Sequence, residues 1–199
     1  MSTTITFKAG ELKRLLANAA LFAAPAKDYL PALEVVRFDW DGDHLFAVAT
    51  NRYVLSWEES FTFEAECRES FSVNTADAKK IIAMIPASPR PDAVATVEYD
   101  SESGWALFTF GGNTIKANTE HGEFPKYRRL IPGDDAKAEV DTIVIGAQWL
   151  TLLAKVKCAW KGLTHGGQPV RFQFNGSKPV GVSIGEHFKA IVIPIKNVG

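Results

Sequence analysis

Apolar and polar positions follow one order that recurs along the chain. Residues 9–24 carry apolar side chains at helical spacing, and Pro25 ends this stretch because it cannot continue a helix. A short alternating stretch, residues 5–8, precedes the helix. Three further alternating or apolar stretches follow it, at residues 33–40, 45–50 and 53–63, with turn signals between them. The pattern predicts a strand, a helix and three strands.

The same order returns twice more. A strand at residues 70–73 precedes a helix that starts near Asn74 or Thr75 and ends at Ile85, and strands follow at residues 94–99, 105–110 and 114–119. In the third instance a strand at residues 142–145 precedes a helix at 147–160, and strands follow at residues 170–174, 180–184 and 188–195. One such repeat alone leaves sheet edges and an apolar helix face uncovered, so neighbouring repeats must share them. We predict an α+β fold of three β-α-β-β-β repeats, with helices on one side and antiparallel sheets on the other.

The segment of residues 123–132 separates the second repeat from the third. Pro125 and Pro132 fix φ and remove backbone donors, so this segment is neither a helix interior nor a central strand. An aromatic pair and three cations lie within it. The segment is typical of a linker, and its place between repeats suggests a boundary. The predicted division is a two-repeat domain at residues 1–132, with repeats at 1–68 and 69–132, and a half domain at 133–199.

Composition narrows the function. The chain has 199 residues, is 46% hydrophobic and has a formal net charge of −1, which argues against a uniformly basic nucleic-acid binder but not against local cationic faces. Cys67 and Cys158 lie far apart without a CxxC pattern, as is usual for reduced thiols. The N-terminal residues lack the basic and apolar regions of a signal peptide, and no run approaches a membrane span. We expect a cytoplasmic protein with no membrane partner.

No catalytic constellation stands out. The sequence contains no GxGxxG, P-loop, GxSxG or HExxH pattern, and its four histidines lie in or beside predicted turns. Asp39, Asp41 and Asp43 could together hold a divalent cation, but no glutamate follows at the spacing of an EF-hand loop. The prediction is a protein that is not an enzyme and has no metal and no cofactor.

Three stretches match the pattern of a known family. LPALEVV at residues 30–36, followed by ATNRYVL at residues 49–55, is similar to RPxLxGV followed by ATDGxRL. GEFPKYRRLIP at residues 122–132 resembles a stretch that closes a two-repeat domain. Lys178 and Pro179, with AIVIPIK at residues 190–196, are similar to a C-terminal YxVMPMR. Together they resemble the DNA sliding clamp family, in particular the bacterial-type β clamp of DNA polymerase III. The resemblance implies the DNA-clamp fold.

The chain departs from that family in places. Asn51 and Arg52 stand where the family has Asp-Gly, so the geometry of this turn is expected to differ. Ile193 and Ile195 replace methionines, and Lys196 replaces an arginine. The family's bacterial chains contain six repeats, against three predicted here. Since clamp rings close with twelve repeats, the resemblance implies a homo-oligomer, with a homotetramer favoured and a dimer possible.

The resemblance also implies a function: a processivity factor in DNA replication that encircles duplex DNA without sequence specificity and tethers a polymerase. Such a protein needs diffuse cations on its helices to attract phosphates. Cations lie largely off the apolar stripes of all three predicted helices, and we predict that they face DNA: Lys13, Arg14, Lys79, Lys80, Lys155 and Lys157.

In the family an apolar pocket binds short peptide motifs of the polymerase and the clamp loader. The positions that match it are Leu33, Thr50, Arg52, Tyr53, Leu55, Pro125, Arg129, Leu130, Pro179, Ile191, Val192, Ile193, Pro194 and Ile195. Leu33, Leu55 and Val192 also suit a plain β-sheet core. The alternative function is a clamp-like decoy or adaptor that binds these peptides without encircling DNA.

Overall fold

The computed structural model describes residues 2–61, 63–65, 68–119, 122–131, 142–158, 168–174 and 179–195. The first elements are β1 (Ser2–Lys8), α1 (Ala9–Ala20), the short 3₁₀ helix η1 (Ala26–Asp28), β2 (Val35–Asp41), β3 (His44–Thr50), β4 (Val54–Glu59) and β5 (Phe63–Ala65). Next come β6 (Phe71–Asn74), α2 (Thr75–Met84), β7 (Val94–Asp100), β8 (Trp105–Phe110), β9 (Asn113–Asn118) and the 3₁₀ helix η2 (Tyr127–Leu130). The last are α3 (Ala147–Leu153), β10 (Val170–Gln173), β11 (Val180–Ile184) and β12 (Phe188–Val192).

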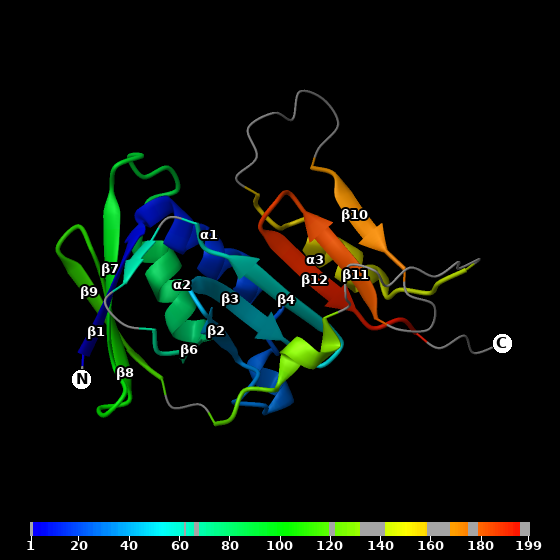
Figure 1. Ribbon diagram of the computed structural model, residues 1–199, viewed down its shortest axis with the longest axis horizontal. Helices are drawn as coiled ribbons and strands as arrows, with labels where there is room; N and C mark the ends of the chain where they lie inside the picture. Colours follow the sequence, from blue (N-terminus) through cyan, green and yellow to red (C-terminus); the bar gives the residue numbers. More distant parts are fainter. Residues whose placement is uncertain are drawn as a thin grey trace.

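The strands form two antiparallel sheets, and α1 and α2 pack side by side against both (Figure 1). The five-stranded sheet has the order β5-β1-β7-β8-β9, and the seven-stranded sheet has the order β10-β11-β12-β4-β3-β2-β6. The first strand of each of the first two repeats pairs with a strand of the other repeat: β1 lies beside β7, and β6 lies beside β2. The predicted α+β class with antiparallel sheets is confirmed, and α1 and α2 contact both sheets.

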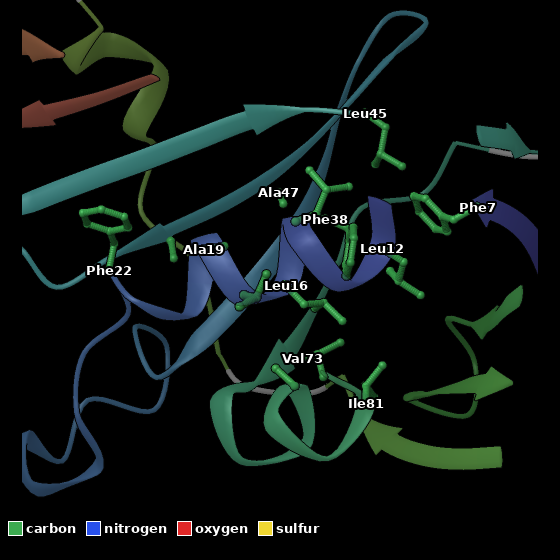
Figure 2. Close-up of a cluster of buried hydrophobic side chains, with 14 of the residues drawn as sticks. Phe7, Leu12, Leu16, Ala19, Phe22, Phe38, Leu45, Ala47, Val73 and Ile81 are labelled. Atoms are coloured by element: carbon green, nitrogen blue, oxygen red, sulfur yellow. The ribbon is translucent and has the colours of Figure 1, made fainter. Parts of the chain in front are cut away.

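The core forms around α1. Its apolar stripe at Leu12, Leu15 and Leu16 is fully buried, as the helical spacing predicts. Figure 2 shows α1 between strands of the large sheet and α2, with Leu16 directed towards Val73 and Ile81. Burial of each large aliphatic side chain contributes about 1.5–3 kcal/mol, so this stripe accounts for much of the stability of the core.

One strand pair attaches the third segment of the chain (from residue 142 to residue 195) to the first segment (from residue 2 to residue 65). β12 pairs with β4 from Phe188 opposite Glu58 to Val192 opposite Val54, which extends the large sheet through β11 to β10. Leu153 and Val156 enter the same core as α1. Sequence segments far apart along the chain therefore share one sheet and one core.

A buried polar cluster reinforces this attachment. The Glu58 carboxylate on β4 is 2% exposed and forms an ion pair with Arg14 of α1. Asn18 Nδ2 donates to Glu58 Oε2 and to the carbonyl oxygen of Lys157, both at 2.8 Å. Asn18 Oδ1 accepts from the backbone N–H of Lys157 at 2.9 Å. One side chain thus satisfies a buried carboxylate and both backbone groups of a distant residue.

Two predicted helices end earlier than expected. The first ends at Ala20, because the N–H groups of Leu21 and Phe22 bond back by three residues and Ala24 donates to Leu33. The third helix ends at Leu153 instead of 160. Asn18 holds the backbone of Lys157 away from a helical partner. Residues 159–160 of this prediction lie outside the described part.

Three predicted strands also differ. The long strand at 53–63 divides into β4 and β5, because Glu11 Oε1 accepts from the Ser60 hydroxyl and the Phe61 N–H at 2.9 and 2.7 Å. The last strand ends at Val192 instead of 195. Residues 142–146 pair with no described strand, although the Ile195 N–H donates to the Val144 carbonyl at 2.8 Å.

The Asn18 cluster gives a first prediction. Asn18→Ala should lower the free energy of unfolding by about 2–3 kcal/mol, because it removes the donor to Glu58 Oε2 and both side-chain partners of the Lys157 backbone in a largely buried site. Asn18→Asp keeps the shape but replaces the donor with a second carboxylate, and should cost more at neutral pH. Urea unfolding followed by tryptophan fluorescence measures both; equal stability of Asn18→Ala and the parent chain would contradict this role.

Candidate functional site

Part of the predicted pocket set, Thr50, Arg52, Tyr53, Leu55, Ile191, Val192 and Ile193, lies on or beside β4 and β12, where these strands meet. Leu55 and Ile191 lie opposite each other in this strand pair and are both buried. The Ile193 N–H donates to the Tyr53 carbonyl at 2.9 Å, which continues the ladder beyond Val192. Tyr53 in turn stacks on Trp149 of α3, with ring centroids 6.2 Å apart. The first and third segments therefore both contribute to this surface.

Apolar side chains on this surface remain open to solvent. Tyr53 is 54% exposed, Leu130 53%, Ile193 44% and Ile195 51%. Five of the predicted residues, Leu33, Thr50, Leu55, Ile191 and Val192, are instead buried. Leu55 and Ile191 form the floor of the surface, because they share one apolar cluster, whereas the Val192 side chain packs in the separate core around α1. Large exposed aliphatic and aromatic groups are what a binding surface presents.

The turn before β4 has a strained residue. Arg52 has a φ of 79°, in the left-handed region that glycine adopts without penalty. The Asn51 carboxamide accepts from the N–H groups of Tyr53 and Val54, each at 3.1 Å, and the Thr50 hydroxyl donates to the Val54 carbonyl at 2.8 Å. These bonds hold the arginine in a conformation that costs on the order of 1 kcal/mol or more.

The linker segment covers one face of the large sheet. Phe124 and Tyr127 pack with Val48, Leu55 and Trp57 in a second apolar cluster, separate from the core around α1. In Figure 1 the 3₁₀ helix η2 lies across the ends of β3 and β4. The segment is thus a part of the sheet's outer packing, as well as the connection to the third segment.

A buried aspartate anchors this segment. Tyr127 Oη and Arg128 Nη2 each donate to Asp39 Oδ2 at 2.8 Å, and Arg37 Nε donates to Asp39 Oδ1 at 3.0 Å. Burial alone would raise the pKa of Asp39, but the hydrogen bonds from Arg128 and Tyr127 and the charge of Arg37 outweigh it and lower the pKa. Burial and the Asp39 charge raise the pKa of Tyr127.

The aspartates that the sequence grouped as a possible cation site bind cations of the protein itself. Asp39 and Asp41 both pair with Arg128, and Asp43 pairs with Arg68 at 2.6 Å. Within the described part of the chain no three His, Cys, Asp or Glu side chains are arranged to hold a metal ion. No described helix is long and apolar enough to cross a membrane.

A groove of about 520 Å³ lies along the linker segment. Predicted residues Pro125 and Arg129 line it, together with Arg37, Asp39, Gly122, Glu123, Phe124, Lys126, Tyr127 and Arg128. No ion pair is found for Lys126 or Arg129 among the described residues, so their cations face the groove's solvent. Arg37 and Asp39 contribute to this groove from β2.

The six predicted DNA-facing cations have different surroundings. Lys79, Lys80, Lys155 and Lys157 are exposed, and Lys80 pairs with Asp77 at 2.8 Å. Lys13 Nζ donates to the Ile82 carbonyl at 2.9 Å and to that of Ile85, at the C-terminus of α2. Burial and then the nearby charge of Lys157 lower the pKa of Lys13, so these two cations are neighbours. The Arg14 side chain is 12% exposed and paired with Glu58.

The whole fold has close counterparts among solved structures. The DNA polymerase III beta subunit of Thermotoga maritima matches 98% of this chain with a TM-score of 0.75 at 15% identity. The beta subunit of Borrelia burgdorferi, in complex with a natural product, matches 98% with a TM-score of 0.77 at 15% identity. The DNA polymerase sliding clamp of Pseudomonas aeruginosa, with ligand, matches 98% with a TM-score of 0.70 at 14% identity.

The chain has the sliding-clamp fold. No family model and no curated protein sequence matches it. The chain spans 66%, 64% and 66% of the length of these three clamp chains. At identities this low, the likeness extends to the sliding-clamp fold alone.

Sequence patterns missed several residues of this surface. Arg37 and Asp39 alternate on one strand and carry opposite charges, which was the available signal for a polar face, but nothing local indicated Tyr127 or Arg128 as their partners. Trp149 fell on a predicted apolar helix face, where stacking on Tyr53 could not be distinguished from ordinary core packing.

Asp39 makes the linker segment sensitive to acid. Because its pKa is lowered on folding, its contribution to stability is complete above the ordinary carboxyl pKa of about 3.9 and is lost as the pH falls through the lower folded value. Asp39→Asn should therefore reduce the unfolding free energy by about 2 kcal/mol at pH 7 and by much less near pH 3. Denaturant titrations at the two pH values measure this. Asp41→Asn, at an exposed carboxylate, is the control, and a loss for Asp39→Asn that does not change with pH would contradict the interpretation.

Proposed function

We propose that this chain acts as a DNA sliding clamp: a non-catalytic protein that holds duplex DNA without sequence specificity and tethers a DNA polymerase through a short peptide. The observation that supports it most is the apolar surface at the β4–β12 junction. There the residues matching the clamp pocket lie around Tyr53, which bonds to Ile193 and stacks on Trp149.

The chemistry of this surface suits an apolar peptide. Leu55 and Ile191 give an aliphatic floor, and Tyr53, Leu130 and Ile193 offer exposed apolar walls. Arg52 is exposed over the Tyr53 ring, Arg129 is exposed in the groove along the linker segment, and each can donate to a peptide carboxylate. In such sites one or two buried anchor residues of the partner supply most of the binding energy. The partners we propose are polymerase and clamp-loader peptides.

DNA would lie against α2 and the residues that follow α3, since Lys155 and Lys157 lie beyond the end of α3 and not on it as predicted. Lys79, Lys80, Lys155 and Lys157 are exposed, and Lys13 adds a charge beside Lys157. We leave Arg14 out of this set, because its charge is already paired with Glu58 inside the protein. Lysines that point to phosphates without reading bases give attraction that any sequence shares, as sliding requires.

A ring of twelve repeats would need four copies of a three-repeat chain, and the proposal therefore includes a homotetramer. A dimer would form an open arc instead. The arc agrees with the alternative function, an adaptor that binds polymerase or loader peptides without encircling DNA. That alternative draws support from Arg14, whose charge is paired with Glu58 within the protein.

The pocket proposal predicts a loss of peptide affinity on Ile193→Ala. Ile193 is 44% exposed, so its truncation should leave the fold intact. Affinity for a fluorescent peptide from the apolar C-terminal tail of a replicative polymerase should fall by about 2 kcal/mol, roughly 30-fold. Fluorescence anisotropy measures it. Val94→Ala, at an exposed apolar residue on the other sheet, is the control; equal affinity of Ile193→Ala and parent would remove this surface from the proposal.

The DNA proposal is tested on closed circles. The parent chain should stay on nicked circular plasmid through gel filtration and leave once the plasmid is linearised. Replacing Lys79, Lys155 and Lys157 together with Glu should shorten retention and flatten its dependence on salt. The matched control replaces Lys27, Lys116 and Lys189, which lie on η1, β9 and β12 and outside the proposed DNA-facing set. If the parent binds the peptide but is not retained on circles, the adaptor function is the correct one.

A further inference from the structure

The third segment of the chain leaves two strand edges open. Among the described residues, β10 pairs with β11 on one side and has no partner on the other. The extended residues 142–146 contact Ile195 on one side, through the bond to Val144, and have no described partner strand on the other. An open edge is a template for another strand.

The edge of β2 that corresponds to the open edge of β10 is paired, so it indicates which kind of strand fits there. β2 and β10 carry the same residues: Val36, Arg37 and Phe38 in one match Val170, Arg171 and Phe172 in the other. In both strands the valine and the phenylalanine pack on the core around α1. β2 takes β6, the strand that leads into α2, on the edge that is open in β10.

The equivalence extends to residues 142–146. These lead into α3 as β1 leads into α1, and their contact with Ile195 matches that of β1 with β5. On its other edge β1 pairs with β7, the strand that follows α2. The open edge beside residues 142–146 therefore requires a strand of the β10 type, and the open edge of β10 requires a strand of the 142–146 type.

Among the described residues, α3 also lacks a partner helix of the kind that α1 and α2 provide for each other. Leu150 is the fourth residue of α3, as Leu12 is of α1 and Ala78 of α2. Leu12 and Ala78 are fully buried where α1 and α2 pack together, whereas Leu150 is 47% exposed. α3 thus presents to solvent the position that the other two helices bury against a partner helix.

We infer that two copies of this chain pair through their third segments, with residues 142–146 of each forming an antiparallel ladder with β10 of the other. Each segment carries both missing strands, so a second copy completes both edges by a twofold contact. This contact does not depend on DNA or peptide binding.

The strand pairs within the chain fix the register. The residue two positions before the start of a helix has an equivalent strand partner in both of the first two repeats. Val73, two positions before α2, lies opposite Val36, and Phe7, two positions before α1, lies opposite Ala95. By the same rule Ile145 lies opposite Val170 of the second copy. Val144 then lies opposite Arg171, and Ile143 opposite Phe172, as Phe71 lies opposite Phe38. The inward pairs are all apolar.

Cross-linking tests this register. In a background with Cys67 and Cys158 replaced by serine, Val144→Cys combined with Arg171→Cys should form a disulfide on mild oxidation and run at twice the chain mass on a non-reducing gel. Val144→Cys with Ser183→Cys is the matched control: Ser183 pairs with Arg171 and is one strand further from the proposed edge. Cross-linking of the control at the same rate, or of neither variant, overturns the register.

Light scattering tests the pairing itself. The 199-residue chain should have a mass of two or four chains, and Leu150→Glu should at least halve it, because the charge would be buried at the contact. Thr151→Glu, at an exposed neighbouring position on α3, should leave the mass unchanged. A single chain mass for the parent, or an unchanged mass for Leu150→Glu with circular dichroism like the parent's, overturns the inference.

Discussion

The Glu58 carboxylate is the constraint around which the large sheet is assembled. A buried charge is tolerated only when it is paired and hydrogen-bonded, and here its partners come from α1 and, through Asn18, from the backbone of Lys157. α1 must therefore lie across β4, and the chain after α3 must pass close to α1. The β4–β12 pairing and the early end of α3 both agree with this arrangement.

The candidate site follows from the same joining of distant segments. Apolar side chains lie at the β4 edge of the first segment and on β12 of the third. The contact between the two segments buries only some of these side chains. Leu55 and Ile191 become a buried floor, while Tyr53 and Ile193 stay open. The linker segment, fixed by Asp39, adds cations beside this surface. An exposed apolar surface is stable here because the strands beneath it are held on both sides.

Local periodicity was sufficient to predict the order of strands and helices, since the stripe of Leu12, Leu15 and Leu16 and the alternation in β2 are short-range signals. It could not predict where elements stop when a distant side chain decides. Asn18 binds the backbone of Lys157 beyond the end of α3, and Glu11 interrupts the strand after β4. Neither contact leaves a local trace in the sequence. The motif at residues 49–55 runs into β4, the strand that pairs with β12, but Asp39 was taken for a possible cation ligand because its arginine partner lies far along the chain.

The pairing of β4 with β12 also affects how the chain is made. β4 leaves the ribosome well before β12 is synthesised, and at about 5–20 residues per second the interval is on the order of ten seconds. Throughout that time the edge of β4 is exposed next to a nearly complete hydrophobic core, a situation that favours aggregation. Glu58 and Glu59 lie on this edge. The Glu58 side chain packs inward against Arg14 of α1, so it is the partly exposed Glu59 whose charge disfavours pairing with another nascent chain until β12 arrives.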